Sequence, residues 1–345
     1  MRSPRLVALL PPLVLLILIG SLAYHAFWEP NSFSVRHEIS LTVSRGSTFK
    51  EISDSLELHG IIENKALFQI AGRILGWTTQ MKVGKYVFPD GISNYDILSS
   101  LHTGKSTVAI PVAIPEGYTS AQIARILSRR IGIDSALFVR LVRDTTFTQE
   151  LGLQEFSLEG YLMPDTYRFY WQMDEREVIR ELVGQFQKIF DDSLGDGEKG
   201  PGLTTRKLLT VASIVEGEAV VDSERAIIAG VFYNRLNKGM KLEADPTVQY
   251  ALNEGPHRVR YRDLAIESPY NTYLHYGLPP TPINNPGRKS ILAALHPASH
   301  NYLYFVSNGE GGHVFSKTYE EHQKAVRRYR RLREMVEARR DSTID

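Results

Sequence analysis

The distribution of apolar and polar positions separates a short N-terminal run from a long globular remainder. No Asp, Glu, Lys or Arg occurs from Leu6 to Trp28. About 20 apolar residues at about 1.5 Å each span a hydrocarbon core of about 30 Å. Arg2 and Arg5 precede this run, so the positive-inside rule predicts a single-pass helix over 6–28 with residues 1–5 in the cytoplasm.

A cleaved signal peptide is the alternative for this run. Ser21 and Ala23 are small residues at the spacing of a cleavage site. Under either interpretation the folded part lies on the periplasmic or extracytoplasmic side of the cytoplasmic membrane. Residues 29–37 follow as a short tether.

Beyond the tether, one pattern of strand and helix signals occurs twice. The run "GSTFKEISDSL" (46–56) matches "GYTSAQIARIL" (117–127) in its Gly, Thr, acidic-or-amide, Ile and Leu positions. A strand pattern at 38–43 precedes the first copy, and each copy predicts a capped helix, a break and a second helix. We therefore expect an internal duplication of a small α/β unit over 38–150.

The rest of the chain predicts helices and one β-hairpin. Helical runs at 204–219 and 223–237 follow a Gly- and Asp-rich loop at 191–203, and Asp222 or Ser223 is expected to cap the second run. The other expected elements are a strand (84–88), a capped helix (93–104), an irregular loop (268–287), a hairpin (302–316) and a basic helix (319–340). Together these patterns predict an α+β fold.

Composition narrows the function classes. The 345 residues contain 43% hydrophobic residues, enough for two compact domains. The chain has 40 Lys and Arg and 39 Asp and Glu, so its formal net charge is only +1. Such a small net charge does not favour binding to the negatively charged backbone of a nucleic acid. It has no cysteine, no HExxH spacing, no GxSxG elbow and no phosphate-binding glycine loop. We therefore expect no nucleic acid, no metal and no cofactor.

Two glutamates lie in the apolar run "LLTVASIVEGEAVVDSERA" (208–226). On a helix, positions two apart differ by about 200°, so Glu216 and Glu218 face different ways. Glu216 lies on a more polar side, where it is either solvated or paired with a cation. Glu218 extends an apolar stripe formed by Leu208, Val211 and Val215.

A carboxyl group at the end of an apolar stripe loses hydration when it ionises, so its pKa rises. A general acid needs such a raised pKa to stay protonated near neutral pH. Gly217 is unfavourable inside a helix by roughly 1 kcal/mol, which suggests a close approach to its backbone. The alternative is that Glu218 is a buried carboxylate paired with Arg225 or another cation across the helix break.

Several blocks of the second half resemble one known family when they are taken together and in order. The blocks are "EGYLMPDTY" (159–167), "ASIVEGEA" (212–219), "SERAIIAGVFYNRL" (223–236), "MKLEADPTVQYAL" (240–252), "SPYNTY" (268–273), "GLPPTPINNPG" (277–287), "HPA" (296–298), "YLYFV" (302–306) and "GGHVF" (311–315). They closely resemble the endolytic murein transglycosylases, the MltG or YceG-like family.

The resemblance implies a membrane helix, a LysM-like region over 38–150 and a catalytic domain over 151–345. It implies cleavage of the β-1,4 bond between N-acetylmuramic acid and N-acetylglucosamine in nascent peptidoglycan, leaving 1,6-anhydromuramoyl ends. Glu218 would be the acid and then the base, without a cofactor. Glycan strands are the expected partner, with peptidoglycan synthases as further candidates. Gly217 departs from the family, where a larger residue is common.

The matching blocks contain five candidate substrate-binding residues. Asp245, Thr247 and Gln249 are expected to orient the sugar or the acid, and Asn271 and Tyr273 to line the cleft. Asp245 could instead cap a helix, and Tyr273 could simply pack. Two other functions stay open: a non-catalytic peptidoglycan-binding scaffold, which would not need an acid at position 218, and an ordinary hydrolase, which would leave reducing ends.

Overall fold

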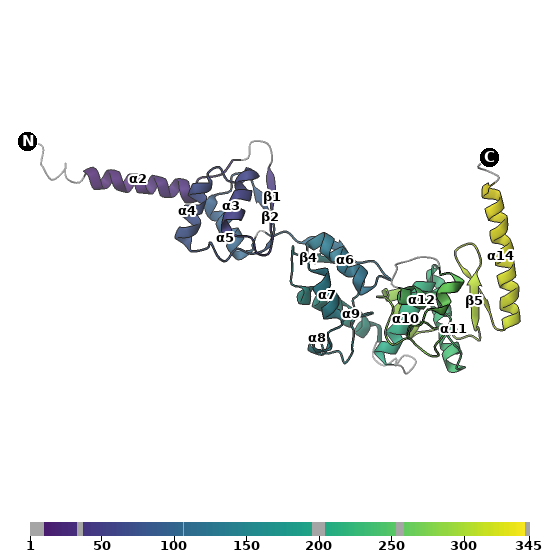
Figure 1. The fold of residues 1–345 in the computed structure, drawn as a ribbon. Helices are drawn as coiled ribbons and strands as arrows, with labels where there is room; N and C mark the ends of the chain where they lie inside the picture. The colour runs from purple at the N-terminus through teal and green to yellow at the C-terminus, as the bar shows by residue number, and fades with distance from the viewer. Residues whose placement is uncertain (1–9, 33–36, 106, 195–203, 253–258, 342–345) are drawn as a thin grey trace, which may run out of the picture. The chain divides into compact units, whose positions relative to one another are not determined.

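The structure is a computed structural model that describes residues 10–32, 37–105, 107–194, 204–252 and 259–341 (Figure 1). The chain forms two compact units. The first contains the described residues up to Val112 together with 129–133 and 168–174, and the second contains 113–128, 134–167 and the described residues from Glu175 onward. Each unit has its own buried core.

The first unit begins with an apolar helix, α2 (Leu10–Phe27). Its last residues, Ala26 and Phe27, are buried in the core of the unit, next to α4 (Lys65–Leu75) and α5 (Asn94–Thr103). Among the described residues, no helix combines the length and the hydropathy needed to cross a bilayer. The predicted span starts at Leu6, and residues 6–9 lie outside the described part of the chain.

A two-stranded sheet and three helices complete this unit. Strands β1 (Glu38–Val43) and β2 (Gly84–Pro89) pair in antiparallel register, with Leu41 opposite Tyr86. Helix α3 (Phe49–Leu58) begins with a capping box in which Thr48 and Glu51 bond each other's backbone amides. The predicted strands and the predicted cap are thus confirmed, and they enclose a core of Ile52, Leu56, Phe68, Phe88 and Ile97.

The second copy of the repeated pattern has a similar order of elements, with one additional helix, α8 (Thr145–Glu150), between its two strands. Its elements are β3 (Ile110–Ala113), α6 (Ser120–Ile131), α7 (Ser135–Val142), α8 (Thr145–Glu150) and β4 (Thr166–Phe169), followed by α9 (Glu175–Leu194). Strand β3 pairs with β4 as β1 pairs with β2. Thr119 caps α6 by accepting from the Gln122 amide, and Gln122 accepts from the Thr119 amide. Both copies therefore share strand pairing and a reciprocal cap.

The rest of the second unit is built around one buried helix, α10 (Thr205–Glu218). It packs against α11 (Arg225–Asn237), α12 (Asp245–Leu252) and α13 (Arg288–Leu295). The other elements are the short helices η1 (Asp222–Glu224) and η2 (Tyr261–Ala265), the hairpin β5 (Tyr304–Ser307) and β6 (His313–Ser316), and α14 (Tyr319–Asp341), which runs beside the hairpin (Figure 1). The α+β class and the hairpin are confirmed.

One predicted cap is wrong. Neither Asp222 nor Ser223 caps α11, whose N-cap residue is Glu224 and makes no side-chain capping bond. Asp222 instead bonds the Arg225 guanidinium and the Lys289 ammonium group. Asp222 therefore bonds charged partners instead of capping the helix. One of these partners, Lys289, is far away in sequence, so the local sequence pattern does not predict this outcome.

Candidate active site

Glu218 is the last residue of α10 and lies where the helix backbone stops. The helix is capped by Thr204, whose hydroxyl accepts from the Lys207 amide at 3.4 Å, and it ends before Ala219, which has an extended conformation. Every residue from Leu208 to Val215 is buried. Glu218 therefore lies at the edge of the core. It is at the C-terminal end of α10, where the helix macrodipole disfavours a negative charge.

Several effects favour the protonated form of Glu218. Burial, followed by the negative charge of Asp245, raises the pKa of Glu218 to about 8, and the backbone amide of Asp245 opposes this shift. The group is partly buried rather than enclosed. A carboxyl group in this state retains a proton near neutral pH and can still reach a ligand.

Glu216 has a different environment two residues earlier. Its side chain is 7% exposed, and its Oε1 lies 3.2 Å from Nη1 of Arg225. Its Oε2 accepts from the Gly287 amide at 2.9 Å. Arg225 is further bonded to Asp222 and Ser290. The cation that could have neutralised Glu218 is therefore committed to Glu216, and pairing of Glu216 with a cation is confirmed.

Asp245 and Tyr273 lie close to Glu218. Asp245 opens α12, and its Oδ1 accepts from the Tyr273 hydroxyl at 2.6 Å. Burial, this hydrogen bond and the charges of Asp245 and Glu218 raise the pKa of Tyr273, so its hydroxyl remains a donor. The three side chains form one electrostatically coupled group, in which Tyr273 fixes the orientation of Asp245.

Thr247 and Asn271 are buried and bonded to backbone. The Thr247 hydroxyl donates to the Ala244 carbonyl at 2.7 Å and lies 2.9 Å from the Thr272 hydroxyl. The Asn271 amide donates to the carbonyls of Leu264 and Ile266, each at 2.9 Å. These two residues hold the start of α12 and the irregular loop in place, which positions Asp245 and Tyr273.

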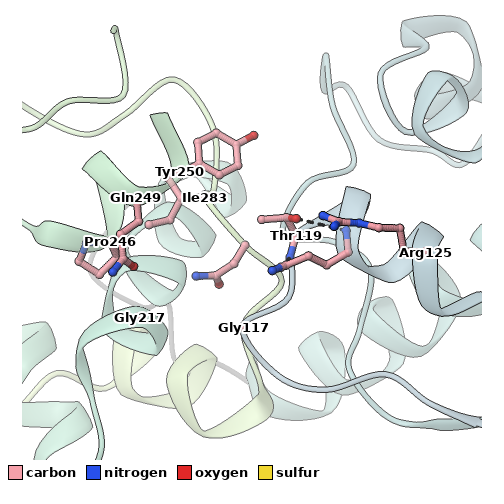
Figure 2. Close-up of a pocket in the computed structure, with 10 residues that line it drawn as sticks. Gly117, Thr119, Arg125, Gly217, Pro246, Gln249, Tyr250 and Ile283 are labelled. Atoms are coloured by element: carbon pink, nitrogen blue, oxygen red, sulfur yellow. Dashed lines mark hydrogen bonds between the residues drawn. The ribbon is translucent and has the colours of Figure 1, made fainter. Parts of the chain in front are cut away.

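Gln249 lines a pocket of about 150 Å³ beside the end of α10. Figure 2 shows its walls, with Thr119 and Arg125 of the second repeat copy facing Pro246, Gln249 and Tyr250 of α12. Gly217 lines the same pocket, and a Cβ atom there would lie 2.6 Å from Cβ of Pro246. The sequence suggested that another group approaches the backbone of Gly217 closely, and in the structure that group is the ring of Pro246.

A buried polar cluster, formed by Ser120, Glu159 and Asn285, holds the first turn of α6 at this pocket. The Glu159 carboxyl accepts from the amide and hydroxyl of Ser120 at 2.8 and 2.7 Å and from Asn285 at 2.9 Å. Asn285 also accepts from the amides of Gly160 and Leu162. Burial raises the pKa of Glu159.

Sequence reasoning missed the wall of the pocket that comes from the second repeat copy. Thr119, Gln122 and Arg125 lie in "GYTSAQIARIL", which was interpreted as part of a separate repeated region. No local pattern in the sequence indicates this contact, because the second repeat copy reaches the pocket through the tertiary bonds of Asn285 to Gly160 and Glu159. Among the described residues, no cluster of three His, Cys, Asp or Glu could hold a metal.

Comparison with known proteins gives consistent matches. The family model described as "YceG-like family" matches residues 41–328. An endolytic murein transglycosylase of Bacillus subtilis is 33% identical over 330 residues, which are 91% of each chain. Another from Streptococcus pneumoniae is 30% identical over 84% of this chain and 58% of its own length. The crystal structure of a YceG-like protein from Listeria monocytogenes matches with a TM-score of 0.58 and 35% identity, over 84% of this chain and 98% of that one.

Proposed function

The chain belongs to the YceG-like family, and we propose that it is an endolytic murein transglycosylase in which Glu218 is the catalytic acid and base. The observation that supports this role is the contrast within the glutamate pair. Glu216 is paired with Arg225, whereas burial and Asp245 raise the pKa of Glu218 to about 8. A carboxyl group with such a raised pKa retains a proton near neutral pH and can donate it.

In the first step, protonated Glu218 donates its proton to the glycosidic oxygen between N-acetylmuramic acid and N-acetylglucosamine. The bond from C1 to that oxygen breaks, and positive charge develops on the muramic ring. Asp245, oriented by the Tyr273 hydroxyl at 2.6 Å, provides a fixed negative charge beside this centre. The N-acetylglucosamine end leaves with the proton that Glu218 supplied.

In the second step, the Glu218 carboxylate removes the proton from the C6 hydroxyl of the same muramic residue. The C6 oxygen attacks C1 and closes the 1,6-anhydro ring, and Glu218 is protonated again. Two-carboxylate glycosidases need a second acid as nucleophile or to activate water. Here the nucleophile is part of the substrate, and its high effective concentration makes a single acid–base residue sufficient.

Product analysis of the full chain and of Glu218→Gln tests this function. Uncrosslinked glycan strands are incubated with each protein, and the products are identified by mass spectrometry. The wild type should yield anhydromuramoyl ends, which are one water lighter than hydrolysis products. Glu218→Gln should lower kcat at least about 1000-fold, because general acid–base catalysis by one group is worth up to about 10⁴.

The matched control is Glu267→Gln, the same substitution at an exposed position of the second unit. It should leave the rate unchanged. Hydrated reducing ends would make the protein an ordinary hydrolase. Strand binding without any cleavage by the wild type, unaffected by Glu218→Gln, would make it a scaffold.

We also propose that the apolar run within residues 6–28 anchors the chain in the cytoplasmic membrane with the catalytic unit outside, while its last turn, with Ala26 and Phe27, packs in the first unit. The support is the uncharged run from Leu6 to Trp28 behind Arg2 and Arg5. Full-length chain should stay with membranes washed in alkaline carbonate, and release into the wash would contradict the anchor.

A further inference from the structure

A second pocket adjoins the one beside Glu218. It has a volume of about 460 Å³ and is lined by residues that include Arg143, Phe156, Tyr270 and Thr281. Thr119 and Tyr250 line both pockets. The two pockets therefore share part of their wall, and their linings run from Gly217, next to Glu218, past Tyr250 to Arg143. We call the two pockets together the groove.

Aromatic rings form part of the groove wall. The rings of Tyr250 and Tyr270 are 4.8 Å apart between centroids, and the Tyr270 hydroxyl is fixed by Thr281 at 2.9 Å. Phe156 is 45% exposed at the far pocket. Sugar rings have apolar C–H faces that pack on aromatic rings, so these residues suit a saccharide chain.

Two arginines line the groove, one in each pocket. Arg125 lies in the first pocket and Arg143 in the second, and both side chains are exposed. Arg125 donates from Nε to the Ala121 carbonyl at 3.3 Å, which leaves its terminal nitrogens available. Neither arginine forms an ion pair with any carboxylate among the residues that the structure describes.

The charge of Arg143 acts on Glu159, the acidic group of the second pocket, but the two side chains form no ion pair within the described residues. The Glu159 carboxyl is 4% exposed and already accepts from Ser120 and Asn285. A guanidinium presents a planar set of donors that matches a carboxylate. The sugars of a glycan strand are neutral, and the anionic groups of uncrosslinked peptidoglycan are the carboxylates of its peptide stems.

We infer that this groove binds the glycan strand next to the cleaved bond and that Arg125 and Arg143 bind carboxylates of its peptide stems. The inference rests on the proposed function and adds a specificity to it: the substrate is a strand that carries charged stems. Recognition of two successive anionic positions along the groove selects strands with charged stems over strands whose stem carboxylates have been neutralised.

The test compares two substrates that differ in charge alone. Uncrosslinked strands with intact stems are used as they are, or after carbodiimide coupling with glycinamide, which converts stem carboxylates to neutral amides. The full wild-type chain should show a kcat/KM at least about tenfold higher on the charged strands, since a hydrogen bond to a charged group is worth about that factor. The preference should weaken as salt is added.

Arg125→Gln, Arg143→Gln and the double variant should lower this charged-to-neutral ratio, with the double variant close to one. Arg125→Lys should restore part of it. Arg140→Gln is the matched control, because Arg140 is exposed on α7 and lines neither pocket. Thermal unfolding verifies that each variant is folded.

The outcomes separate the two proposals. Anhydro product from both substrates at equal kcat/KM overturns stem recognition and keeps the enzymatic function. A loss in the arginine variants that is equal on both substrates also overturns stem recognition, because the arginines then act on the sugars or on the fold. The absence of anhydro product from either substrate overturns the proposed function itself.

Discussion

At the scale of single residues, two glutamates two positions apart have different electrostatic surroundings because their partners differ. Glu216 pairs with the Arg225 guanidinium and accepts a hydrogen bond from the Gly287 amide. Glu218 lies at the C-terminal end of α10, is partly buried and is close to the negative charge of Asp245. All three features disfavour its ionisation. One helix thus presents a structural carboxylate and a candidate acid from the same turn.

The coupling between Asp245 and Glu218 predicts a shifted pH profile. Glu218 must be protonated in the free enzyme, so kcat/KM should be high below its pKa and fall as pH rises through about 8. Asp245→Asn removes a negative charge that raises the pKa of Glu218. The alkaline limb should therefore move to lower pH, by roughly one unit.

The measurement is the pH at which kcat/KM falls on the alkaline side of the profile. This pH can be compared between variants even when their maximal rates differ. Glu267→Gln is a suitable control, because Glu267 is an exposed acid of the second unit that is not among the groups acting on the pKa of Glu218. An unchanged limb in Asp245→Asn would show that the charge of Asp245 does not act on the acid.

At the scale of secondary-structure elements, the site depends on how closely α12 approaches α10. The ring of Pro246 packs over Gly217, where a Cβ would be 2.6 Å from Cβ and 2.7 Å from Cγ of the proline. Pro246 directly follows Asp245, so any displacement of the ring also moves the carboxylate that acts on Glu218. The absence of a side chain at Gly217 therefore sets the distance between Glu218 and Asp245.

Gly217→Ala is predicted to lower both stability and kcat. Alanine improves helix propensity by roughly 1 kcal/mol, but overpacking against Pro246 costs about 1–3 kcal/mol. The net loss should be up to about 2 kcal/mol, and Gly217→Ala with Pro246→Ala should recover it. A double-mutant cycle in denaturant, with kcat for each variant, measures the coupling.

Additive effects of the two substitutions would contradict a direct contact between these residues. A more stable and fully active Gly217→Ala would mean that α12 accommodates a side chain without moving Asp245.

Local sequence signals predicted much of the fold but not the walls of the site. The strand Glu38–Val43, the cap at Thr48 and the helix ending at Glu218 follow from periodicity and capping, which act within a few residues. The contact of Pro246 with Gly217 and the bond from Asn285 to Gly160, 125 residues away, follow no periodic pattern. Such pairings arise from tertiary packing.

At the scale of the whole molecule, the last turn of the N-terminal helix α2 packs into the core of the first unit. Ala26 is 3% exposed and Phe27 is 9% exposed, both within the core of that unit. The Asn94 amide donates to the Ala26 carbonyl at 3.1 Å, and Asn31 bonds Asn94 in turn. Signal-peptide cleavage after Ala23 would leave all of these residues in place.

Two truncated chains should therefore differ in the stability of the first unit. A chain that starts at Tyr24 keeps the packed turn, whereas one that starts at Pro30 loses the burial of Phe27, worth about 1.5–3 kcal/mol, and the acceptor of Asn94, worth about 1 kcal/mol. Amide hydrogen exchange in β1 and β2 should be faster in the shorter chain by a factor of about 50 or more, because exchange from the core reports the free energy of opening. Equal protection would mean that the last turn of α2 packs on the unit without stabilising it, and that the first unit is complete from Pro30 onward.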